Sequence, residues 1–165
     1  MAHQPVIDGL EFAKAAASLQ GAWRVGELER LRGMLRSDEG ELRYELSGVP
    51  ERHGRPSLQL KVEGVLQLAC QRCLGALEFP LQLEVSLLLA ATQAEVDAEP
   101  LAAEGPESIV AGRHMPVHAL VEDEVLLAIP IAARHEACAR AEKATAGTKK
   151  MPFAGLRELI SGTKH

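Results

Sequence analysis

Aromatic residues are scarce in this chain, at 3% of its 165 residues, so its hydrophobic fraction of 47% rests mainly on leucine, valine and alanine. Such a composition offers few rings on which the bases of single-stranded RNA can stack. No apolar run approaches the roughly 20 residues that a membrane-spanning helix needs. The first residues, Met1–Pro5, also lack the basic and apolar regions of a signal peptide. We therefore expect a cytoplasmic protein, with no membrane partner, that folds as a single domain over residues 1–165.

Cysteine is also rare, with three residues at positions 70, 73 and 138. An odd number of thiols in a reducing compartment favours free thiols or metal ligands over disulfides. Basic residues are in the minority for most of the chain: residues 1–133 carry 11 Lys and Arg against 20 Asp and Glu, whereas residues 134–165 carry 7 against 3. An acidic body with a basic tail argues against a protein that coats nucleic acid through a broad basic face.

The longest regular pattern consists of two alternating stretches on either side of the turn Cys70–Gly75. Apolar residues occupy every second position through most of Leu58–Leu68 and again through Leu77–Leu89. A period of two over this length predicts half-buried antiparallel strands that form a long central hairpin. Glu41–Leu46 alternates in the same way and precedes a connection rich in turn residues. We expect it to add a third strand and so complete an antiparallel meander.

Helical patterns flank these strands on both sides. The strongest covers Pro116–Ile129, where apolar residues repeat along one face and Pro130 follows. We expect this amphipathic helix to cover the sheet, with the acidic run Glu122, Asp123 and Glu124 in solvent on its other side. Shorter helices are predicted near both termini, at residues 5–21, 27–35 and 151–160. Strands in the middle of the chain and helices at both ends predict an α+β fold.

Two segments have the composition of loops. Residues 91–107 are rich in alanine, proline and acidic side chains, which is typical of a mobile acidic loop. We expect Ser108–Val110 to follow it as a short edge strand. Residues 132–165 are polar and basic, and we expect them to be partly flexible. The amphipathic helix within this tail can dock on the body or on a partner through Phe153, Leu156 and Ile160.

Two pairs of residues have the spacing of metal ligands. Cys70-x-x-Cys73 lies on the hairpin turn, and His135-x-x-Cys138 follows the end of the main helix. Structural zinc sites take four thiolate and imidazole ligands, commonly as two such pairs. If the helix packs along the sheet, Pro130 can return the chain toward the turn. The sequence therefore predicts a structural zinc site made of Cys70, Cys73, His135 and Cys138.

Other interpretations of these residues remain. Cys70 is in phase with the buried face of its strand, so it also fits a small core residue, and His135 fits a solvated side chain in a polar segment. His114 or His118 can replace His135 as the fourth ligand. A redox Cys-x-x-Cys motif fits less well, because that motif normally opens a helix beside a parallel strand and this one closes a β-hairpin.

The acidic run offers carboxylates, but no other part of an enzyme site accompanies it. The sequence contains no GxGxxG, Walker or GxSxG motif. We therefore expect no enzymatic activity and no small-molecule substrate. The alternative is a divalent-metal-dependent RNA-processing hydrolase that uses Glu122, Asp123 and Glu124.

Three segments together resemble a known bacterial family. They are Leu68-Ala69-Cys70-Gln71-Arg72-Cys73-Leu74, the acidic helix from Val121 to Pro130, and the terminal Met151-Pro152-Phe153-Ala154-x-Leu156. Their order and spacing are similar to those of the large ribosomal RNA subunit accumulation proteins, the YceD family. Some branches of that family carry a second Cys-x-x-Cys where this chain has His135-x-x-Cys138. Relatives usually have Asn where Met151 stands.

The resemblance implies a non-enzymatic cytoplasmic factor that supports synthesis, processing or stability of large-subunit (23S) ribosomal RNA. Its expected partners are proteins or RNA of the ribosome-assembly or rRNA-processing machinery. The surface for such a partner is predicted to include Glu122, Asp123, Glu124 and Phe153. A zinc-stabilised protein-interaction module is a further alternative.

Overall fold

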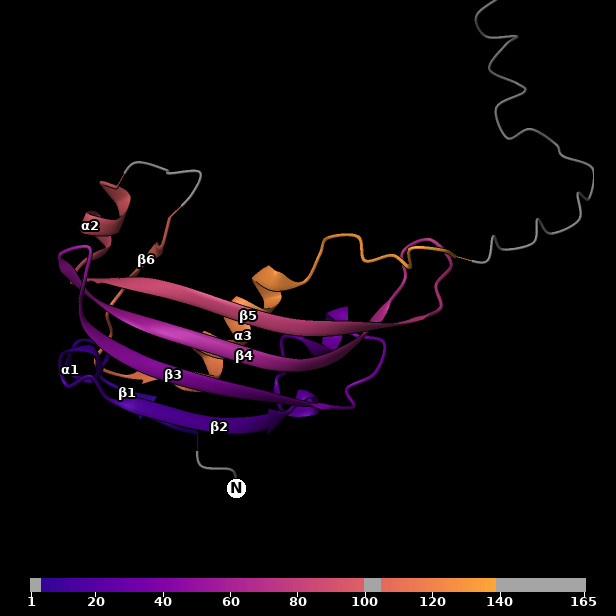
Figure 1. Ribbon diagram of the computed structural model, residues 1–165, viewed down its shortest axis with the longest axis horizontal. Helices are drawn as coiled ribbons and strands as arrows, with labels where there is room; N and C mark the ends of the chain where they lie inside the picture. The colour runs from indigo at the N-terminus through magenta and orange to yellow at the C-terminus, as the bar shows by residue number, and fades with distance from the viewer. Residues whose placement is uncertain (1–3, 100–104, 139–165) are drawn as a thin grey trace, which may run out of the picture.

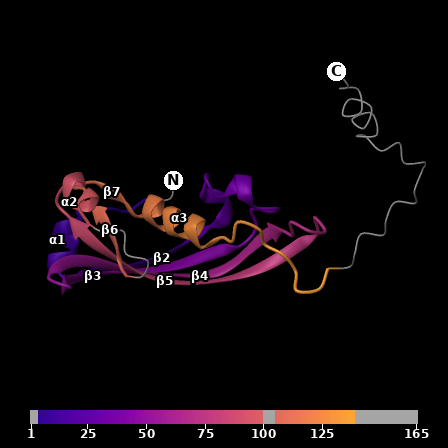
Figure 2. The same ribbon diagram turned by 90° about the horizontal axis from the view of Figure 1, so that it is seen from above.

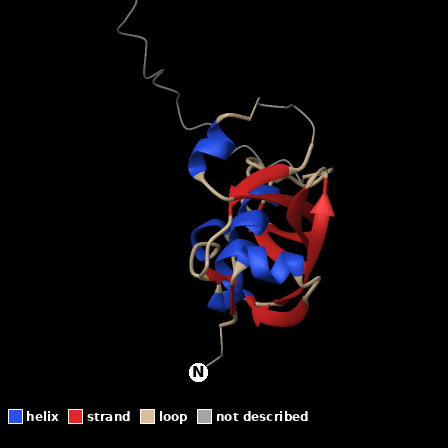
Figure 3. Ribbon diagram, turned by 90° about the vertical axis from the view of Figure 1, so that its left-hand side faces the viewer, coloured by secondary structure: helices blue, strands red, loops and turns tan. Residues whose placement is uncertain are grey.

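The computed structural model describes residues 4–99 and 105–138. A five-stranded sheet, in the order β2-β3-β4-β5-β6, extends along the molecule with helix α3 on one face (Figures 1 and 2). Viewed from the end, the helices lie to one side of the strands (Figure 3). The strands of the sheet are β2 (Ser18–Arg24), β3 (Glu41–Arg52), β4 (Arg55–Ala69), β5 (Ala76–Ala90) and β6 (Glu107–Val110). The predicted α+β class is confirmed.

Strands β4 and β5 form the long hairpin that the alternating pattern indicates. They pair antiparallel from Ser57 opposite Leu88 to Ala69 opposite Ala76. One parity of β4 is fully buried and supplies the centre of the core, namely Leu58, Leu60, Val62, Leu66 and Leu68. The other parity carries polar residues on the open face, where Lys61 Nζ lies 3.6 Å from Glu84 Oε1 on the paired strand. The period of two therefore separates core from solvent along β4, whereas at the end of β5 residues 87–90 are all buried.

The edge strand β6 pairs parallel to β5, which makes the sheet mixed and corrects the prediction of a purely antiparallel sheet. A parallel neighbour requires the chain to cross over between the two strands. Helix α2 (Gln93–Asp97), capped by Thr92, forms the first part of this connection. It lies inside the segment 91–107, of which residues 100–104 are outside the described chain.

A polar cluster joins this connection to the sheet. Glu99 accepts hydrogen bonds from the guanidinium of Arg55 and from Ser108 Oγ, the latter at 2.6 Å. These two hydrogen bonds, against a smaller opposing effect of burial, lower the pKa of Glu99. Glu99, which directly precedes residues 100–104, therefore ties the crossover to β4 and β6.

The N-terminal helix is shorter than the predicted span of 5–21. It comprises α1 (Gly9–Lys14), after strand β1 (Val6–Ile7), and the chain then enters β2. Asp8 caps α1 as its sequence position indicates, since its Oδ1 accepts from the Glu11 amide at 3.1 Å. Ala16 adopts a φ of 48°, which ends the helix. Residues 18–24 then pair with β3, so long-range strand pairing outweighs the local helical spacing.

The helix predicted over residues 27–35 is wrong. The chain there forms two short 3-10 turns, η1 (Val25–Glu27) and η2 (Arg32–Met34), and buries Leu28 and Leu31 between them. The amide of Arg30 donates to the carboxylate of Glu122 rather than to a helical carbonyl. A partner on α3 therefore replaces the hydrogen bonds that a helix would form here.

Helix α3 (Val117–Ala128) agrees closely with its prediction. It follows β7 (Met115–Pro116), which pairs with β1 at the N-terminus. Val117, Val121 and Val125 are fully buried in the same core cluster as the apolar residues of β4. Among the described residues, no helix combines the length and the hydropathy required to span a membrane.

Gly48 allows α1 to contact the sheet closely. A Cβ at this position would overlap the carbonyl oxygen of Phe12 and lie 2.7 Å from the Ala13 Cα, both in the backbone of α1. Backbone atoms cannot move aside without shifting the helix. We expect Gly48→Ala to lower the free energy of unfolding by about 1–3 kcal/mol in chemical denaturation. Gly33→Ala is the matched control, because no atom lies within 4 Å of its added Cβ; equal losses in both variants would contradict this packing.

Candidate metal centre

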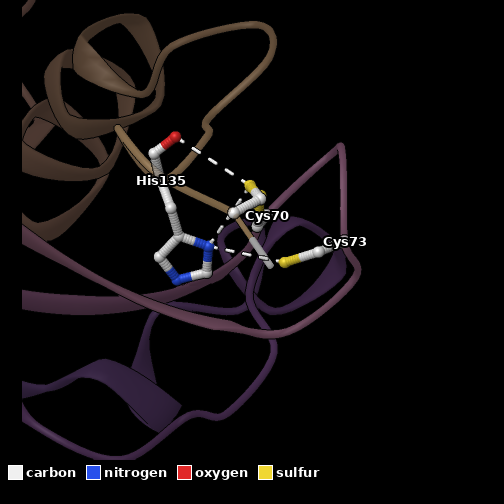
Figure 4. A group of neighbouring side chains, drawn as sticks. Cys70, Cys73 and His135 are labelled. Atoms are coloured by element: carbon white, nitrogen blue, oxygen red, sulfur yellow. Dashed lines mark hydrogen bonds between the residues drawn. The ribbon is translucent and has the colours of Figure 1, made fainter. Parts of the chain in front are cut away.

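The structure brings together the four residues predicted as ligands. Cys70 follows β4 and Cys73 lies in the hairpin turn, while His135 and Cys138 lie beyond the end of α3. Their ligand atoms all lie within 4.8 Å of one another. Figure 4 shows the His135 ring directed toward the turn that carries Cys70 and Cys73. Within the described chain these four residues form the one group of at least three ligands close enough to hold a metal ion.

Backbone hydrogen bonds hold the two halves of this site in place. The Leu74 amide donates to the Cys70 carbonyl at 2.8 Å, and the Cys70 amide donates to the Gly75 carbonyl at 3.0 Å, which closes the turn. The Gln71 amide then donates to the Ala133 carbonyl at 2.8 Å. This last bond fastens the chain after α3 to the turn, so it positions the second ligand pair opposite the first. Figure 2 shows the segment after α3 running toward the end of the hairpin.

The spacing of the ligand atoms fits a tetrahedral ion. Cys70 Sγ lies 3.4 Å from Cys138 Sγ, and His135 Nδ1 lies 3.4 Å from Cys73 Sγ and 3.8 Å from Cys138 Sγ. Zinc bonds of about 2.3 Å to sulfur and about 2.0–2.1 Å to nitrogen place the ligands of a tetrahedron about 3.5–3.8 Å apart. The site therefore has the dimensions and donor types of a Cys3His centre.

The imidazole of His135 is oriented by a hydrogen bond on its far side. Its Nε2 lies 2.8 Å from the carbonyl oxygen of Ala76. A carbonyl accepts only, so Nε2 carries the proton and Nδ1 presents a lone pair to the three sulfurs. Metal-bound histidines commonly have such an outer partner, which fixes the tautomer and the ring plane.

The surroundings of the thiols also favour metal coordination through their effect on the thiol pKa. Burial acts to raise the pKa of Cys70, but hydrogen bonds from the backbone of Cys73, His135 and Arg72, together with one from the Cys138 side chain, lower it to about 5. Burial raises the pKa of Cys138, and its contact with Cys70 raises it further. One thiolate therefore exists near neutral pH, and a bound cation would favour release of the remaining protons.

The structure also bears on the other interpretations of Cys70 and of the fourth ligand. Cys70 is fully buried, as its strand parity indicates, so its core position and its place in the cluster are compatible. Neither His114 nor His118 belongs to the ligand group, and His118 lines a separate cavity near Glu122. The thiol that hydrogen-bonds with the Cys70 thiol is that of Cys138, which belongs to the second ligand pair.

The acidic run on α3 does not form the solvated face that its sequence predicts. Glu122 and Glu124 are only 4% and 8% exposed, and of the three carboxylates Asp123 alone is open to solvent. Glu122 Oε1 accepts from the amides of Arg30 and Leu31, at 2.6 and 3.3 Å, and Asp123 pairs with the Arg30 guanidinium. The prediction failed for Glu122 because the chain between η1 and η2 covers it, whereas Glu124 lies in a depression beside Glu107 of β6.

The proposed partner surface remains a prediction. Phe153 lies outside the described residues. The anchoring role of Glu122 was not predicted from the sequence. Its position gave a signal, because it directly follows Val121 and precedes Val125 by three, at the border of the apolar stripe of α3.

Metal analysis of the purified, untagged protein tests the centre. We expect about one zinc ion per chain, because the cluster offers a complete set of four ligands. His135→Gln and Cys73→Ser should each lose most of this zinc. His114→Gln, which changes an exposed histidine outside the cluster, should retain it. Substoichiometric zinc in the wild type, or equal zinc in all variants, would contradict the assignment.

Replacement of the buried carboxylate tests the contact between α3 and the turns. Glu122→Ala leaves the Arg30 amide without its acceptor and leaves the Leu31 amide with only the Leu28 carbonyl. A buried group that loses its partner costs about 1–3 kcal/mol. We therefore expect a clear drop in the free energy of unfolding, measured by urea denaturation. Asp123→Asn breaks an exposed ion pair and should cost about 0–1 kcal/mol. A smaller loss for Glu122→Ala than for Asp123→Asn would argue against this role.

Comparison with known proteins gives one match. A family model described as "Large ribosomal RNA subunit accumulation protein YceD" matches residues 58–159, well over half of the chain. This range contains most of the hairpin, α3 and all four ligands of the metal centre. Neither the curated proteins nor the solved structures gave a significant match. The family name connects its members to the accumulation of large-subunit ribosomal RNA. This chain belongs to the YceD family of large ribosomal RNA subunit accumulation proteins.

Proposed function

We propose that this protein is a non-enzymatic cytoplasmic factor that supports synthesis, processing or stability of 23S ribosomal RNA. The family match over residues 58–159 carries this proposal. Its partners are proteins or RNA of the ribosome-assembly or rRNA-processing machinery. The matched range includes both the cysteine turn and α3, so the proposed function rests on the same elements that build the core.

A structural zinc ion is part of this proposal. Four protein side chains complete a tetrahedron and leave no position for substrate or water, whereas catalytic zinc sites keep such a position open. The ion would connect the hairpin turn to the chain that follows α3. This supports a zinc-stabilised interaction module. The two functions are compatible, because such a module is one means by which a biogenesis factor binds its partner.

The contacts of the acidic run support a non-enzymatic role. A divalent-metal hydrolase needs carboxylates that converge on the ion. Here Glu122 turns toward the amides of Arg30 and Leu31, and Asp123 turns toward the guanidinium of Arg30. Glu122 and Asp123 therefore already stabilise the fold, and among the described residues no carboxylate of the acidic run belongs to a group of at least three ligands close enough to hold a metal ion.

Deletion of the gene tests the proposed process. We expect the ratio of large- to small-subunit ribosomal RNA to fall, as measured by electrophoresis of total RNA. Wild-type protein and His114→Gln should restore the ratio, and His135→Gln should restore it poorly because the metal centre is incomplete. A ratio that stays unchanged in the deletion strain during both slow and fast growth would count against the function.

Incubation with precursor RNA tests the absence of hydrolysis. Purified protein with magnesium or manganese should leave the precursor uncut. Cleavage that disappears in Asp123→Asn, but persists in the open-face control Glu63→Gln, would overturn the non-enzymatic proposal in favour of the hydrolase.

A further inference from the structure

A groove with apolar walls lies between α3 and β6. Its volume is about 580 Å³, and it adjoins a second cavity of about 460 Å³. Glu107, Glu124 and Leu127 line both, so the two form parts of one depression. Leu127 is 71% exposed on its rim. The apolar residues of the groove are Ile109, Val110, Met115, Leu120, Leu126 and Leu127.

The groove is lined by more carboxylates than arginines. Glu107, Asp123 and Glu124 line it, and the Glu124 oxygens are not among the fully buried polar atoms, so a cation placed in the groove can reach them. Burial raises the pKa of Glu124, and the nearby Glu107 and Asp123 raise it further. Opposite charges at close range attract each other. Arg30, the arginine that lines this groove, already pairs with Asp123, which leaves Glu107 and Glu124 to attract a further cation. The site therefore fits an apolar ligand that carries a cation.

Residues 151–160 of this chain have that chemistry. Phe153, Leu156 and Ile160 repeat at the spacing of one helical face, and Arg157 lies four positions after Phe153 on the same side. Lys149 and Lys150 precede the segment. An amphipathic helix that lays its apolar face into a groove is a common mode of peptide recognition.

The intervening chain is long enough for the segment to reach the groove. Eleven residues lead from Leu127 to Cys138, so these two positions are at most about 40 Å apart. Thirteen lead from Cys138 to Met151, and they span at most about 45 Å. The chain from Cys138 to Met151 is therefore long enough to bring Met151 back to Leu127 at the end of α3.

We propose that residues 151–160 dock within the same molecule as a short helix in the groove between α3 and β6, with Arg157 paired to Glu124. The docked segment covers the exposed side chain of Leu127 and places a cation beside Glu124. This goes beyond the proposed function, because it assigns an intramolecular ligand to a surface of the body. Its tests do not depend on the role in ribosomal RNA.

Photo-crosslinking of the full zinc-loaded chain tests the location. p-Benzoyl-phenylalanine replaces Phe153, and the crosslinked peptides are identified by mass spectrometry. We expect crosslinks to the peptides of residues 107–127. The same photoreactive residue at Glu158, on the other side of the predicted helix, should give few of them. No crosslink from position 153, or crosslinks only to other parts of the body, would overturn the proposal.

Isotope mixing separates docking within one chain from docking between copies. Equal amounts of ¹⁵N-labelled and unlabelled protein are irradiated together. We expect each crosslink to join peptides of the same isotope. Mixed pairs as the main product would show that a second copy occupies the groove, and would overturn the intramolecular proposal.

Hydrogen exchange measures the contribution of individual contacts. Arg157→Glu and Leu127→Glu should each speed exchange of residues 151–160 by about tenfold, the change that corresponds to about 1.4 kcal/mol. Leu127 is exposed, so its replacement leaves the core intact. Arg140→Glu makes the same charge change in the link and should leave exchange unchanged. Equal exchange in all variants, or an equal effect of Arg140→Glu, would refute the docking.

Discussion

The alternation of side chains along β4 determines where the core and the metal centre are placed. Its alternate residues from Leu58 to Leu68 form the centre of the core, and Cys70 continues the same parity beyond the end of the strand. A register shift of one residue would turn each of these side chains to the open face. It would also turn the Cys70 thiol away from Cys138. Core packing and ligand geometry therefore depend on one strand register.

Helix α3 is held from two sides by different kinds of contact. Its valines pack in the same core as β4, whereas Glu122 accepts hydrogen bonds from Arg30 and Leu31 in the N-terminal region. The apolar contact has little directional preference, but the hydrogen bonds fix the position of the helix along its axis. Burial of a carboxylate is tolerated here because amide donors replace its water.

The sequence predicts those parts of the fold that local patterns determine. The hairpin follows from alternation over many residues, and the ligand set follows from thiol and imidazole chemistry at short spacings. The turns at Arg30 and Leu31 could not be predicted in this way, because their acceptor, Glu122, lies 92 and 91 residues away. The direction of β6 depends on the crossover through α2, which strand periodicity does not encode.

The metal centre also has a topological consequence. Cys73 and His135 are 62 residues apart, and a bound ion would close the intervening chain, with β5, α2, β6 and α3, into a ring. A covalent crosslink across a loop of similar length restricts the unfolded chain by about 4 kcal/mol. Such a ring would confine the crossover and the main helix to one cooperative unit, and loss of the ion would release them together.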